Sequence, residues 1–463
     1  MNYIFAFDIG TTHTKTAVYD EHGTRTYHEV RNSPQLHLSR QGHVEIDPDE
    51  VFRLFAASFS DALNSLNLKS EDSIYVSTSG IAPTFILVDR ELKPLTNGIL
   101  YSDLRFSKTF KALAPYRQEF FEQTGNPLDS QHWLVRLEYF KKMFPDKINK
   151  AKYITDILSY VQLRLTGKNM MSLSVAHASG LLDYRTLDFN SLTKEMFGVY
   201  FDTIPQIQRY NEYSEARFDF GRRTVKIIIK PPISDAMAAA YSLGAHENSV
   251  ITLNIGTTAT MFYRMDEPRP SRHYFLNVSP FGGYYFAVGS TAAAGGYIDY
   301  ILNLLQMNHS DLVKLRGKTE ILETPYIWGE KSPIFDPDAS AAIVKFKGYH
   351  TKKDLALASI EAVANSVHHN LVYMNDGGSK IKEIRMSGKA GSYHVLRTAL
   401  ACLTKSNVIY HKELDELYAH YVLITGKFNL GKGQITKCDH KLAQYYSDKF
   451  SEYTKLYRIM EKL

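Results

Sequence analysis

The sequence predicts an α/β protein built from two similar halves, and three observations support this. An apolar run followed by IGTT occurs twice, in FAFDIGTTHTKTAVYD near the start and in ITLNIGTTATMFYRMD near the middle. In both halves, strand-like runs alternate with segments whose apolar residues recur at helical spacing. The length of 463 residues also suits two or more domains. We place the boundary where Pro231 and Pro232 follow a β-rich run, which divides the chain into residues 1–231 and 232–463.

Each IGTT segment predicts a β-hairpin. Tyr3–Phe7 and Thr16–Tyr19 are β-rich runs on either side of the first Gly-Thr-Thr, and the tight turn Asp20–Gly23 follows them. Val250–Leu253 and Thr260–Tyr263 flank the second copy in the same way. Glycine lets the backbone approach a ligand closely, and consecutive N–H groups in such a bend bind anions.

A duplicated fold with one phosphate-holding hairpin in each half, both facing a central cleft, explains the repeat. Asp8 leads the first copy and Asn254 leads the second. Since only one of the two copies keeps a carboxylate, we expect Asp8 alone to serve a metal ion.

The remaining elements follow from periodicity and from start and stop signals. DPDE marks the start of the first helix, and Gly167 and Gly244 end two others. The predicted helices cover residues 49–67, 134–144, 151–165, 235–243, 355–374, 394–403 and 441–463, and the further strands cover 74–76, 85–88 and 380–386.

Composition excludes several classes of protein. A net charge of +5 is mild for this length and does not argue for nucleic acid, and we interpret the basic segment Phe220–Lys230 as a strand with solvated ends. No apolar stretch approaches the roughly 20 residues that span a bilayer. Cys402 and Cys438 lack CxxC spacing, so we expect neither a disulfide framework nor a cysteine-based zinc site. These features favour a cytoplasmic protein without a membrane partner.

Three common catalytic motifs are absent from the sequence. It contains no G-x-x-x-x-G-K-[ST] phosphate loop, no G-x-S-x-G nucleophile elbow and no HExxH zinc site. The 17 histidines therefore predict no metal centre.

Eight segments, in order along the chain, resemble the FGGY family of carbohydrate kinases. A single such segment is weak support, but eight in register are strong. The segments are DIGTTHTK (8–15), STSGIAPTFILVD (77–89), GILYSDLR (98–105), SDAMAAAYSLGA (234–245), NIGTTATMF (254–262), AAAGGYIDYIL (292–302), PYIWGEKSPIFDPDA (325–339) and MSGKAGSYHVLRTALA (386–401).

The resemblance implies two ribonuclease-H-like domains of the actin-like ATPase fold, with ATP and a sugar in an interdomain cleft. It implies transfer of the γ-phosphoryl group of ATP, with Mg²⁺, to a hydroxyl of a small sugar, polyol or sugar acid. A xylulose-like ketose and gluconate are the first candidates, with ribulose and glycerol as further ones. The sequence does not decide the oligomeric state, a homodimer being one option.

Two aspartates carry the expected chemistry. Asp235 matches the family's catalytic base, which would accept the proton of the substrate hydroxyl. From position alone it could equally be the N-cap of its helix, a role that Ser234 could also fill. Asp8 would orient Mg²⁺ directly or through water; the alternative is an acid that merely ends an edge strand.

The resemblance also implies two sets of binding residues. On the nucleotide side they are Thr11, Thr12, His13, Lys15, Gly256, Thr257, Gly295, Asp299, Gly388 and Lys389. On the substrate side they are Ala82, Pro83, Asp103, Arg105, Gln131 and Asp235. For Asp103 and Arg105 the alternative is a surface ion pair.

The sequence departs from the family pattern in both halves. Ile81, Ala82 and Pro83 replace a Gln-Met-His run that often contacts the sugar, and Gln131 stands where an aromatic residue is usual. Lys389 replaces the central glycine of a Gly-Gly-Ala motif, and Lys345 replaces another glycine.

Near the C-terminus, Tyr418 and Tyr421 enter a helix that is usually made of small residues, which implies altered packing behind the nucleotide. The changes at Lys389 and Lys345 are the best support for an alternative function, a catalytically weak homologue that senses sugar or nucleotide. Retention of Asp8 and Asp235 argues against that alternative. A filament or chaperone-like ATPase would not explain the sugar-site segments 77–89 and 98–105.

Overall fold

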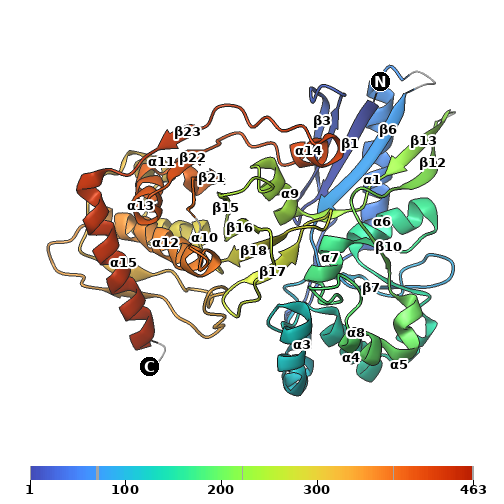
Figure 1. The fold of residues 1–463 in the computed structure, drawn as a ribbon, viewed down its shortest axis with the longest axis horizontal. Helices are drawn as coiled ribbons and strands as arrows, with labels where there is room; N and C mark the ends of the chain where they lie inside the picture. Colours follow the sequence, from blue (N-terminus) through green and yellow to red (C-terminus); the bar gives the residue numbers. More distant parts are fainter. Residues whose placement is uncertain (1, 69–71, 222, 379, 461–463) are drawn as a thin grey trace. The chain divides into compact units, whose positions relative to one another are not determined.

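The computed structural model describes residues 2–68, 72–221, 223–378 and 380–460, and these form two compact units. Unit 1 holds the described residues up to Ser242, together with Asn277–Tyr285 and Asp415–Phe428. Unit 2 holds Leu243–Leu276, Phe286–Leu414 and the described residues from Asn429 onward (Figure 1). The predicted division into residues 1–231 and 232–463, and the cleft between the two halves, stay predictions.

A mixed sheet forms the centre of unit 1, with the strand order β12-β13-β6-β1-β2-β3. Its central strand β1 pairs antiparallel with β2 and parallel with β6, while β14 adds to the end of β6. The bounds are β1 Asn2–Ile9, β2 His13–Tyr19, β3 Arg25–Asn32, β6 Ser73–Gly80, β12 Ser214–Phe220, β13 Arg223–Ile229 and β14 Ile233–Ser234.

Strand β1 is buried on both faces, which explains why its sequence YIFAF shows no alternation of apolar and polar residues. Phe5 and Phe7 belong to the core that includes residues of α1 (Pro48–Ser65) and α6 (Ile157–Thr166). Ile4 and Ala6 point the other way and pack with Leu417 and Tyr421, at and within α14 (Tyr418–Thr425). Asp8 is two residues beyond Ala6 on the same strand, so it lies on the face that α14 covers.

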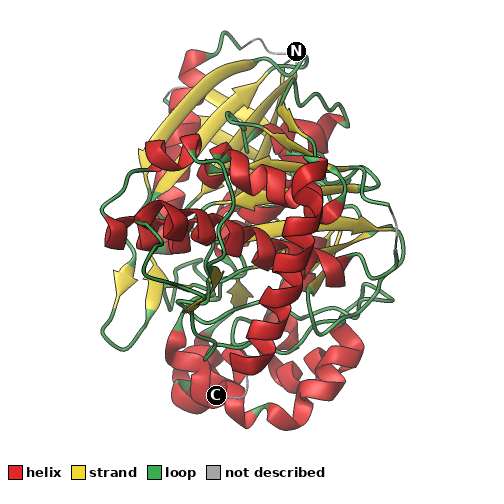
Figure 2. Ribbon diagram, turned by 90° about the vertical axis from the view of Figure 1, so that its left-hand side faces the viewer, coloured by secondary structure: helices red, strands yellow, loops and turns green. Residues whose placement is uncertain are grey.

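Unit 2 has a second sheet, with the order β17-β18-β16-β15-β21-β22-β23. Strand β15 pairs antiparallel with β16 and parallel with β21. The strands are β15 Val250–Ile255, β16 Ala259–Met265, β17 Phe275–Val278, β18 Tyr285–Ser290, β21 Glu383–Ser387, β22 Asn407–Tyr410 and β23 Gln434–Thr436, and the main helices are α10 Gly295–Leu305, α12 Lys352–Met374, α13 His394–Thr404 and α15 His440–Met460. Helix α12 contacts α10 and α13, and α15 lies beside α13; Figure 2 shows these helices in red against the yellow strands.

The predicted duplication is confirmed at the level of topology. Each sheet contains an antiparallel IGTT hairpin, and a parallel strand from later in the chain pairs with the first hairpin strand, in the orders β2-β1-β6 and β16-β15-β21. The predicted helices at residues 49–67, 134–144, 235–243, 355–374 and 394–403 are confirmed as α1, α4, α9, α12 and α13, with bounds that differ by at most three residues.

Shorter elements complete the chain. In unit 1 these are β4 His37–Leu38, β5 Val44–Ile46, β7 Ile86–Val88, β8 Gly98–Ile99, α2 Ser107–Ala112, α3 Arg117–Thr124, α4 Trp133–Met143, α5 Pro145–Lys150, β9 Tyr153–Thr155, β10 Met170–Ser172, α7 Leu173–Ala178, α8 Ser191–Phe197, β11 Gln206–Gln208 and α9 Asp235–Ser242. In unit 2 they are α11 His309–Lys314, β19 Leu322–Thr324 and β20 Ala342–Val344.

One expectation was wrong, and another did not foresee a single disulfide. The helix predicted over residues 151–165 begins only at Ile157, because β9 pairs with β7 and Asp156 caps the helix by accepting from the N–H groups of Leu158 and Ser159. Cys402 and Cys438 form a disulfide, with Cα atoms 4.4 Å apart. A multi-bridge framework needs more cysteines, but this pair meets as a single link between α13 and the segment that precedes α15.

The predicted C-terminal helix at residues 441–463 is α15 as far as Met460, and its last three positions lie outside the described residues. Across the described ranges, no helix combines the length and apolar character that crossing a bilayer requires.

Candidate functional site

Asp8 lies at the carboxyl end of β1, directly beside Ser79 of the parallel strand β6. The Ser79 hydroxyl donates to Asp8 Oδ1 over 2.6 Å. Only 7% of Asp8 is exposed. Burial raises the pKa of this carboxyl group; Glu416 raises it further, whereas the Ser79 hydrogen bond and Lys15 lower it, and the net shift is upward. The protein therefore holds the Asp8 carboxyl group where its ionisation costs free energy.

Lys15 lies opposite Asp8 on β2, and its ammonium group is held by Glu416. Lys15 Nζ donates to Glu416 Oε2 over 2.8 Å. Burial alone lowers the pKa of Lys15, but the charge and hydrogen bond of Glu416 outweigh it, so the pKa is raised. The Ser242 hydroxyl donates to the Glu416 carbonyl over 2.9 Å and accepts from the N–H of Ala419 over 3.1 Å. The end of α9 thus fixes the start of α14, which carries Glu416 to the lysine.

The first IGTT bend presents Thr11, Thr12 and His13 to solvent. Ser33 holds the bend from behind: its hydroxyl donates to the Gly10 carbonyl over 2.7 Å, and its N–H donates to the Thr12 carbonyl over 3.0 Å. A Cβ atom at Gly10 would lie 2.6 Å from the His13 carbonyl oxygen. The tight bend therefore needs glycine and leaves its three outer side chains accessible to a ligand.

Asp235 begins α9, but Ser234 is the residue that caps the helix. The Ser234 hydroxyl accepts from the Met237 N–H over 3.2 Å, while Asp235 Oδ1 accepts from the adjacent Ala236 N–H over 2.7 Å. The Asp235 side chain reaches solvent. The surrounding protein nevertheless desolvates it, and together with Asp8 and Glu416 this raises its pKa to about 7. The helix does not need Asp235 as its cap, which leaves that carboxyl group open to another role.

Tyr101 lies close enough to Asp235 for the two groups to influence each other. Burial raises the pKa of the Tyr101 hydroxyl, and the charge of Asp235 raises it further. Tyr101 follows β8 within the predicted sugar-site segment 98–105, although the sequence pattern did not single it out. An aromatic hydroxyl next to the candidate base suits contact with a polar acceptor molecule.

Asp103 and Arg105 form an internal brace and not the surface ion pair considered from sequence. Arg105 donates through Nε to Asp103 Oδ1 and through Nη2 to Asp103 Oδ2, both over 2.8 Å, and its Nη2 also donates to Glu45 over 2.6 Å. Their side chains are 0% and 9% exposed. Asp103 also accepts from the Val44 N–H over 2.7 Å. Since these contacts occupy both side chains, a role in binding substrate stays a prediction.

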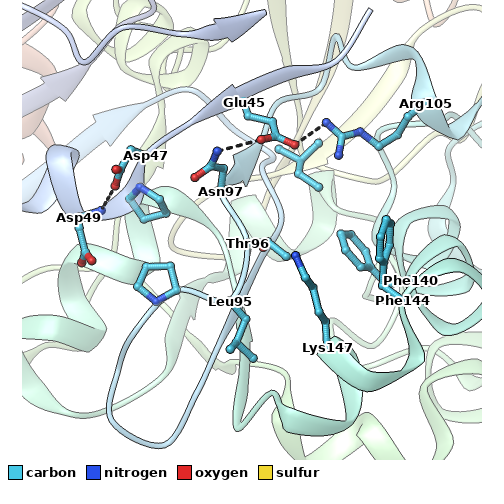
Figure 3. A pocket seen from close by; sticks show the side chains of 13 residues that line it. Glu45, Asp47, Asp49, Leu95, Thr96, Asn97, Arg105, Phe140, Phe144 and Lys147 are labelled. Atoms are coloured by element: carbon cyan, nitrogen blue, oxygen red, sulfur yellow. Dashed lines mark hydrogen bonds and ion pairs between the residues drawn. The ribbon is translucent and has the colours of Figure 1, made fainter. Parts of the chain in front are cut away.

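A cavity of about 390 Å³ borders this brace. In Figure 3, Glu45 lies between Asn97 and Arg105, and Asp47 and Asp49 lie at the start of α1. Among the described residues, the lining includes Arg105 but not Asp8, Ser79 or Asp235. The full lining is Glu45, Asp47, Pro48, Asp49, Pro94, Leu95, Thr96, Asn97, Ile99, Arg105, Phe140, Phe144 and Lys147.

The other predicted substrate residues lie in unit 1. Ala82 and Pro83 follow the same end of β6 as Ser79; Ala82 is half-buried and Pro83 is buried, and the peptide bond between them is cis. Gln131 is half-buried in the turn before α4, where its N–H donates to Asp129 Oδ1 over 3.1 Å. Their contact with a sugar stays a prediction.

In unit 2, four of the predicted nucleotide residues converge. The second IGTT bend binds the start of α10, because the Gly295 N–H donates to the Gly256 carbonyl over 3.0 Å and the Gly296 N–H donates to the Thr257 carbonyl over 2.9 Å. A Cβ atom at Gly295 would lie 2.3 Å from the Gly256 carbonyl oxygen. Gly388 adopts φ +92°, and a Cβ atom there would lie 2.1 Å from the Ile255 carbonyl oxygen. These glycines bring three backbone segments together without side chains between them.

The remaining predicted residues of unit 2 are exposed. Asp299 Oδ1 lies 2.8 Å from His309 Nε2, and His309 Nδ1 is hydrogen-bonded to the Tyr393 hydroxyl. Lys389 follows Gly388 with its side chain in solvent. Lys345 keeps a left-handed backbone, with φ +62°, and pairs with Glu452 over 2.5 Å. This conformation explains why glycine is common at position 345 in the resembled family.

Sequence reasoning missed Ser79, Glu416, Tyr101 and His420. A signal for Ser79 was present: the pair Ser-Gly ends both parallel strands next to the hairpins, at residues 79–80 and 387–388. The other three carried no comparable signal. Tyr418 and Tyr421 of α14 lie against Tyr19 of β2 in unit 1, and their predicted effect on packing behind the nucleotide stays a prediction.

Solved structures of known proteins share this fold. The structure of ligand-bound xylulose kinase from Lactobacillus acidophilus superposes with a TM-score of 0.89 at 20% identity, covering 100% of this chain and 99% of that one. The predicted fold, two domains of the actin-like ATPase class, is thereby confirmed. Xylulose kinase from Bacillus subtilis (strain 168) is 21% identical over 399 residues, 83% of this chain and 80% of the relative. Gluconokinase from the same organism is 21% identical over 441 residues, covering 88% and 84%.

Two family models match most of the chain: the N-terminal domain of the FGGY family of carbohydrate kinases over residues 3–227, and its C-terminal domain over residues 251–420. The protein belongs to the FGGY family of carbohydrate kinases. It is therefore a phosphotransferase that acts on a hydroxyl group, and use of ATP follows from the family.

Proposed function

We propose that the chain transfers the γ-phosphoryl group of ATP to a hydroxyl of a small sugar, polyol or sugar acid, with Asp235 as the general base. A xylulose-like ketose or gluconate is the first candidate acceptor. The observation that carries the proposal is the state of Asp235. It is accessible and not needed as the helix cap, and its pKa of about 7 suits a group that takes up a proton near neutral pH.

The step needs positioning and charge stabilisation more than covalent help. Asp235 would accept the proton as the acceptor oxygen forms its bond to the γ-phosphorus and the bond from that phosphorus to the bridging oxygen of ADP breaks. Tyr101, which lies near Asp235, would orient the acceptor molecule. Lys15 would exchange its contact with Glu416 for the transferring phosphoryl group.

Residues in each unit suit the phosphates and a metal ion. The exposed Thr11 and Thr12 in unit 1 and the open bend at Gly256 in unit 2 offer backbone N–H groups or hydroxyls without side-chain obstruction. Asp8 would serve Mg²⁺, which supplies charge neutralisation on the phosphates when bound. Among the described residues no group of three or more metal-ligating side chains occurs. One carboxylate fits Mg²⁺, because this ion keeps several waters and also binds substrate phosphates.

The decisive experiment measures ADP release from ATP and Mg²⁺ across a panel of ketoses, polyols and aldonic acids. Asp235→Asn should lower turnover on the accepted substrate by roughly 10³-fold, the loss typical of a missing general base. Asp47→Asn, at the start of another helix, is the matched control and should keep normal turnover. A substrate turned over equally well by wild type and Asp235→Asn would refute the role of this aspartate.

The alternative function is a catalytically weak homologue that senses sugar or nucleotide. It predicts that no panel member stimulates ADP release while a non-hydrolysable ATP analogue still binds. The exposed Lys389, at a glycine position of the resembled family, is the first residue to test in that case. Lys389→Gly should then strengthen nucleotide binding.

A further inference from the structure

A buried chain of four hydrogen bonds connects Asp8 to Tyr210 through His420. The Tyr210 hydroxyl lies 2.7 Å from Ser77 Oγ, and Ser77 Oγ lies 2.6 Å from His420 Nδ1. His420 Nε2 lies 3.2 Å from Ser79 Oγ, and Ser79 donates to Asp8 over 2.6 Å. Tyr210, Ser77 and His420 are fully buried, and Ser79 is 1% exposed. All five residues belong to unit 1.

The histidine in this chain is neutral. Burial alone lowers the pKa of His420 to about 3, so at neutral pH the ring carries a single N–H. A neutral imidazole has one donor nitrogen and one acceptor nitrogen. The two sides of the ring therefore cannot behave alike, and the neighbours decide which nitrogen holds the proton.

The hydrogen bond that Ser79 donates to Asp8 sets every other direction in the chain. A hydroxyl has a single proton, so the proton of Ser79 is committed to Asp8. Ser79 Oγ can then only accept from His420, which places the proton on Nε2. The bare Nδ1 accepts from Ser77, and Ser77 in turn accepts from the Tyr210 hydroxyl. All four donors point toward the carboxylate, so their dipoles add in its favour.

We infer that His420 is a positioning residue, which as its Nε2–H tautomer keeps the Ser79 hydroxyl donating to Asp8 Oδ1 and so leaves Oδ2 for the metal ion. The inference rests on the proposed role of Asp8 in serving Mg²⁺. Partners that orient a ligating carboxylate commonly control metal affinity by 10–100-fold. His420 would exert such control from α14, more than 300 residues along the chain from Ser79.

The matching position in unit 2 shows what the carboxylate adds. Ser387 lies beside Asn254 as Ser79 lies beside Asp8, and Ser387 Oγ is 3.1 Å from Asn254 Oδ1. An amide both donates and accepts, so it does not require a fixed direction from its neighbours. The chain of hydrogen bonds with one fixed direction therefore belongs to the hairpin that carries the charged residue, Asp8.

The first test determines the tautomer directly. In protein labelled with ¹⁵N-histidine, the His420 signals, assigned by their loss in His420→Asn, should show a protonated Nε2 and an unprotonated Nδ1. Removing the donor to Nδ1 with Ser77→Ala should increase the fraction of the Nδ1–H form. A wild-type signal dominated by the Nδ1–H form would overturn the inference, and this measurement needs neither substrate nor metal.

The second test uses two amides that each replace one ring nitrogen. The His420→Gln side chain reaches the Nε2 position and can still donate to Ser79, whereas His420→Asn reaches only the Nδ1 position. Binding of Mn²⁺ with a non-hydrolysable ATP analogue, followed by electron paramagnetic resonance, should weaken about tenfold in His420→Asn and little in His420→Gln. His177→Asn alters another buried, neutral histidine of unit 1 and is the matched control, with wild-type binding expected.

The outcomes separate this inference from the proposed function. If Asp8→Asn weakens Mn²⁺–nucleotide binding but His420→Asn and His420→Gln behave alike, the positioning role of His420 is wrong and the proposed function stands. If Asp8→Asn binds like wild type, the metal role of Asp8 itself fails. A stronger loss in His420→Asn than in His420→Gln, at equal thermal stability, supports the inference.

Discussion

The two IGTT hairpins share a backbone frame but hold different groups at its centre. In unit 1 a buried aspartate accepts from Ser79, and in unit 2 an asparagine occupies the same position beside Ser387. Gly80 and Gly388 follow the two serines, and a Cβ atom at either would strike the carbonyl oxygen of the isoleucine in the adjacent strand. The same backbone arrangement thus accepts either a charged or a neutral residue at this position. Burial raises the pKa of the aspartate, so its charge costs stability, and we propose that it is kept for a role at the metal ion.

The bends also differ in length, and this difference positions Lys15. In unit 1 the pairing of Ile9 with Thr14 leaves four residues in the bend, whereas in unit 2 the pairing of Ile255 with Ala259 leaves three. Consequently Lys15 lies opposite Asp8, while Thr260 lies opposite Asn254. The additional residue in the first bend moves a lysine into register with the carboxylate.

Making the first hairpin resemble the second should have the largest effect. Asp8→Asn should reduce kcat at saturating sugar and fixed Mg²⁺ by about 100-fold, because the proposed Mg²⁺ site loses its carboxylate. The same variant should unfold at an equal or higher temperature than wild type, since a costly buried charge is removed. Steady-state kinetics and thermal unfolding check the two parts. Unchanged kcat, or a clear loss of thermal stability, would mean that Asp8 is a structural residue.

Replacing either shared glycine by alanine should lower the stability of the protein, by a similar amount in the two units. Gly388→Ala would place a Cβ atom 2.1 Å from the Ile255 carbonyl oxygen, and Gly80→Ala would place one 2.5 Å from that of Ile9. Because backbone must move in each case, each variant should lose about 2 kcal/mol or more in urea unfolding. Gly256→Ala is the control, because a Cβ atom there meets nothing within 4 Å. Equal stability of all three variants would contradict the shared constraint.

The two serines should differ because one bonds to a charged group and the other to a neutral one. Ser79→Ala should lower the free energy of unfolding by about 2 kcal/mol and Ser387→Ala by about 1 kcal/mol, since hydrogen bonds to charged groups are the stronger. Chemical denaturation of both variants provides the measurement. A larger loss for Ser387→Ala would show that Asp8 is not ionised in the folded protein.

The smallest effect concerns pH. With a pKa of about 7, Asp235 must lose its proton before it can act as a base, so kcat/KM should rise with pH through an acid limb near 7. Asp8→Asn removes a like charge that raises this pKa, so the limb should move to lower pH. A limb that stays in place in Asp8→Asn would exclude electrostatic coupling between the two aspartates.

The same pKa has a consequence for stability. Because the folded-state pKa lies above the ordinary value near 3.9, the folded protein binds more protons than the unfolded chain between about pH 4 and 7. Asp235 therefore contributes a loss of stability as pH rises through that range. Asp235→Asn should remove this contribution, so its free energy of unfolding should fall less steeply with pH than that of wild type.

Local pattern predicted the duplicated α/β fold well, and it placed the hairpins, α9 and most long helices. It did so because strand and helix periodicities are strong where one face is buried, and because Gly-Thr-Thr bends and the Asp235 region are contiguous in sequence. The pattern failed at residues 151–156, where pairing of β9 with β7 overrode the predicted helix. It also failed for Cys402 and Cys438, whose meeting depends on tertiary packing.

The candidate site was predictable only where its residues are near one another in sequence. Lys15 and Glu416 are 401 residues apart, and Ser79 and His420 are 341 residues apart. No periodicity links such positions, because α14 reaches the first sheet only through the fold. Arg105 and Asp103 illustrate the converse: their spacing indicated a pair, but their burial against Glu45 depends on β5.

The return of residues 415–428 to unit 1 sets the order in which this enzyme becomes complete. On the ribosome, the sheet of unit 1 emerges early, but the strand that carries Asp8 lacks its α14 cover until residues 415–428 have been made. Glu416 and His420 arrive together on that segment, so the contacts of Lys15 and Ser79 cannot form before it emerges. A prematurely terminated chain would thus expose the apolar face around Ile4 and Ala6, a recognisable target for chaperones and proteases.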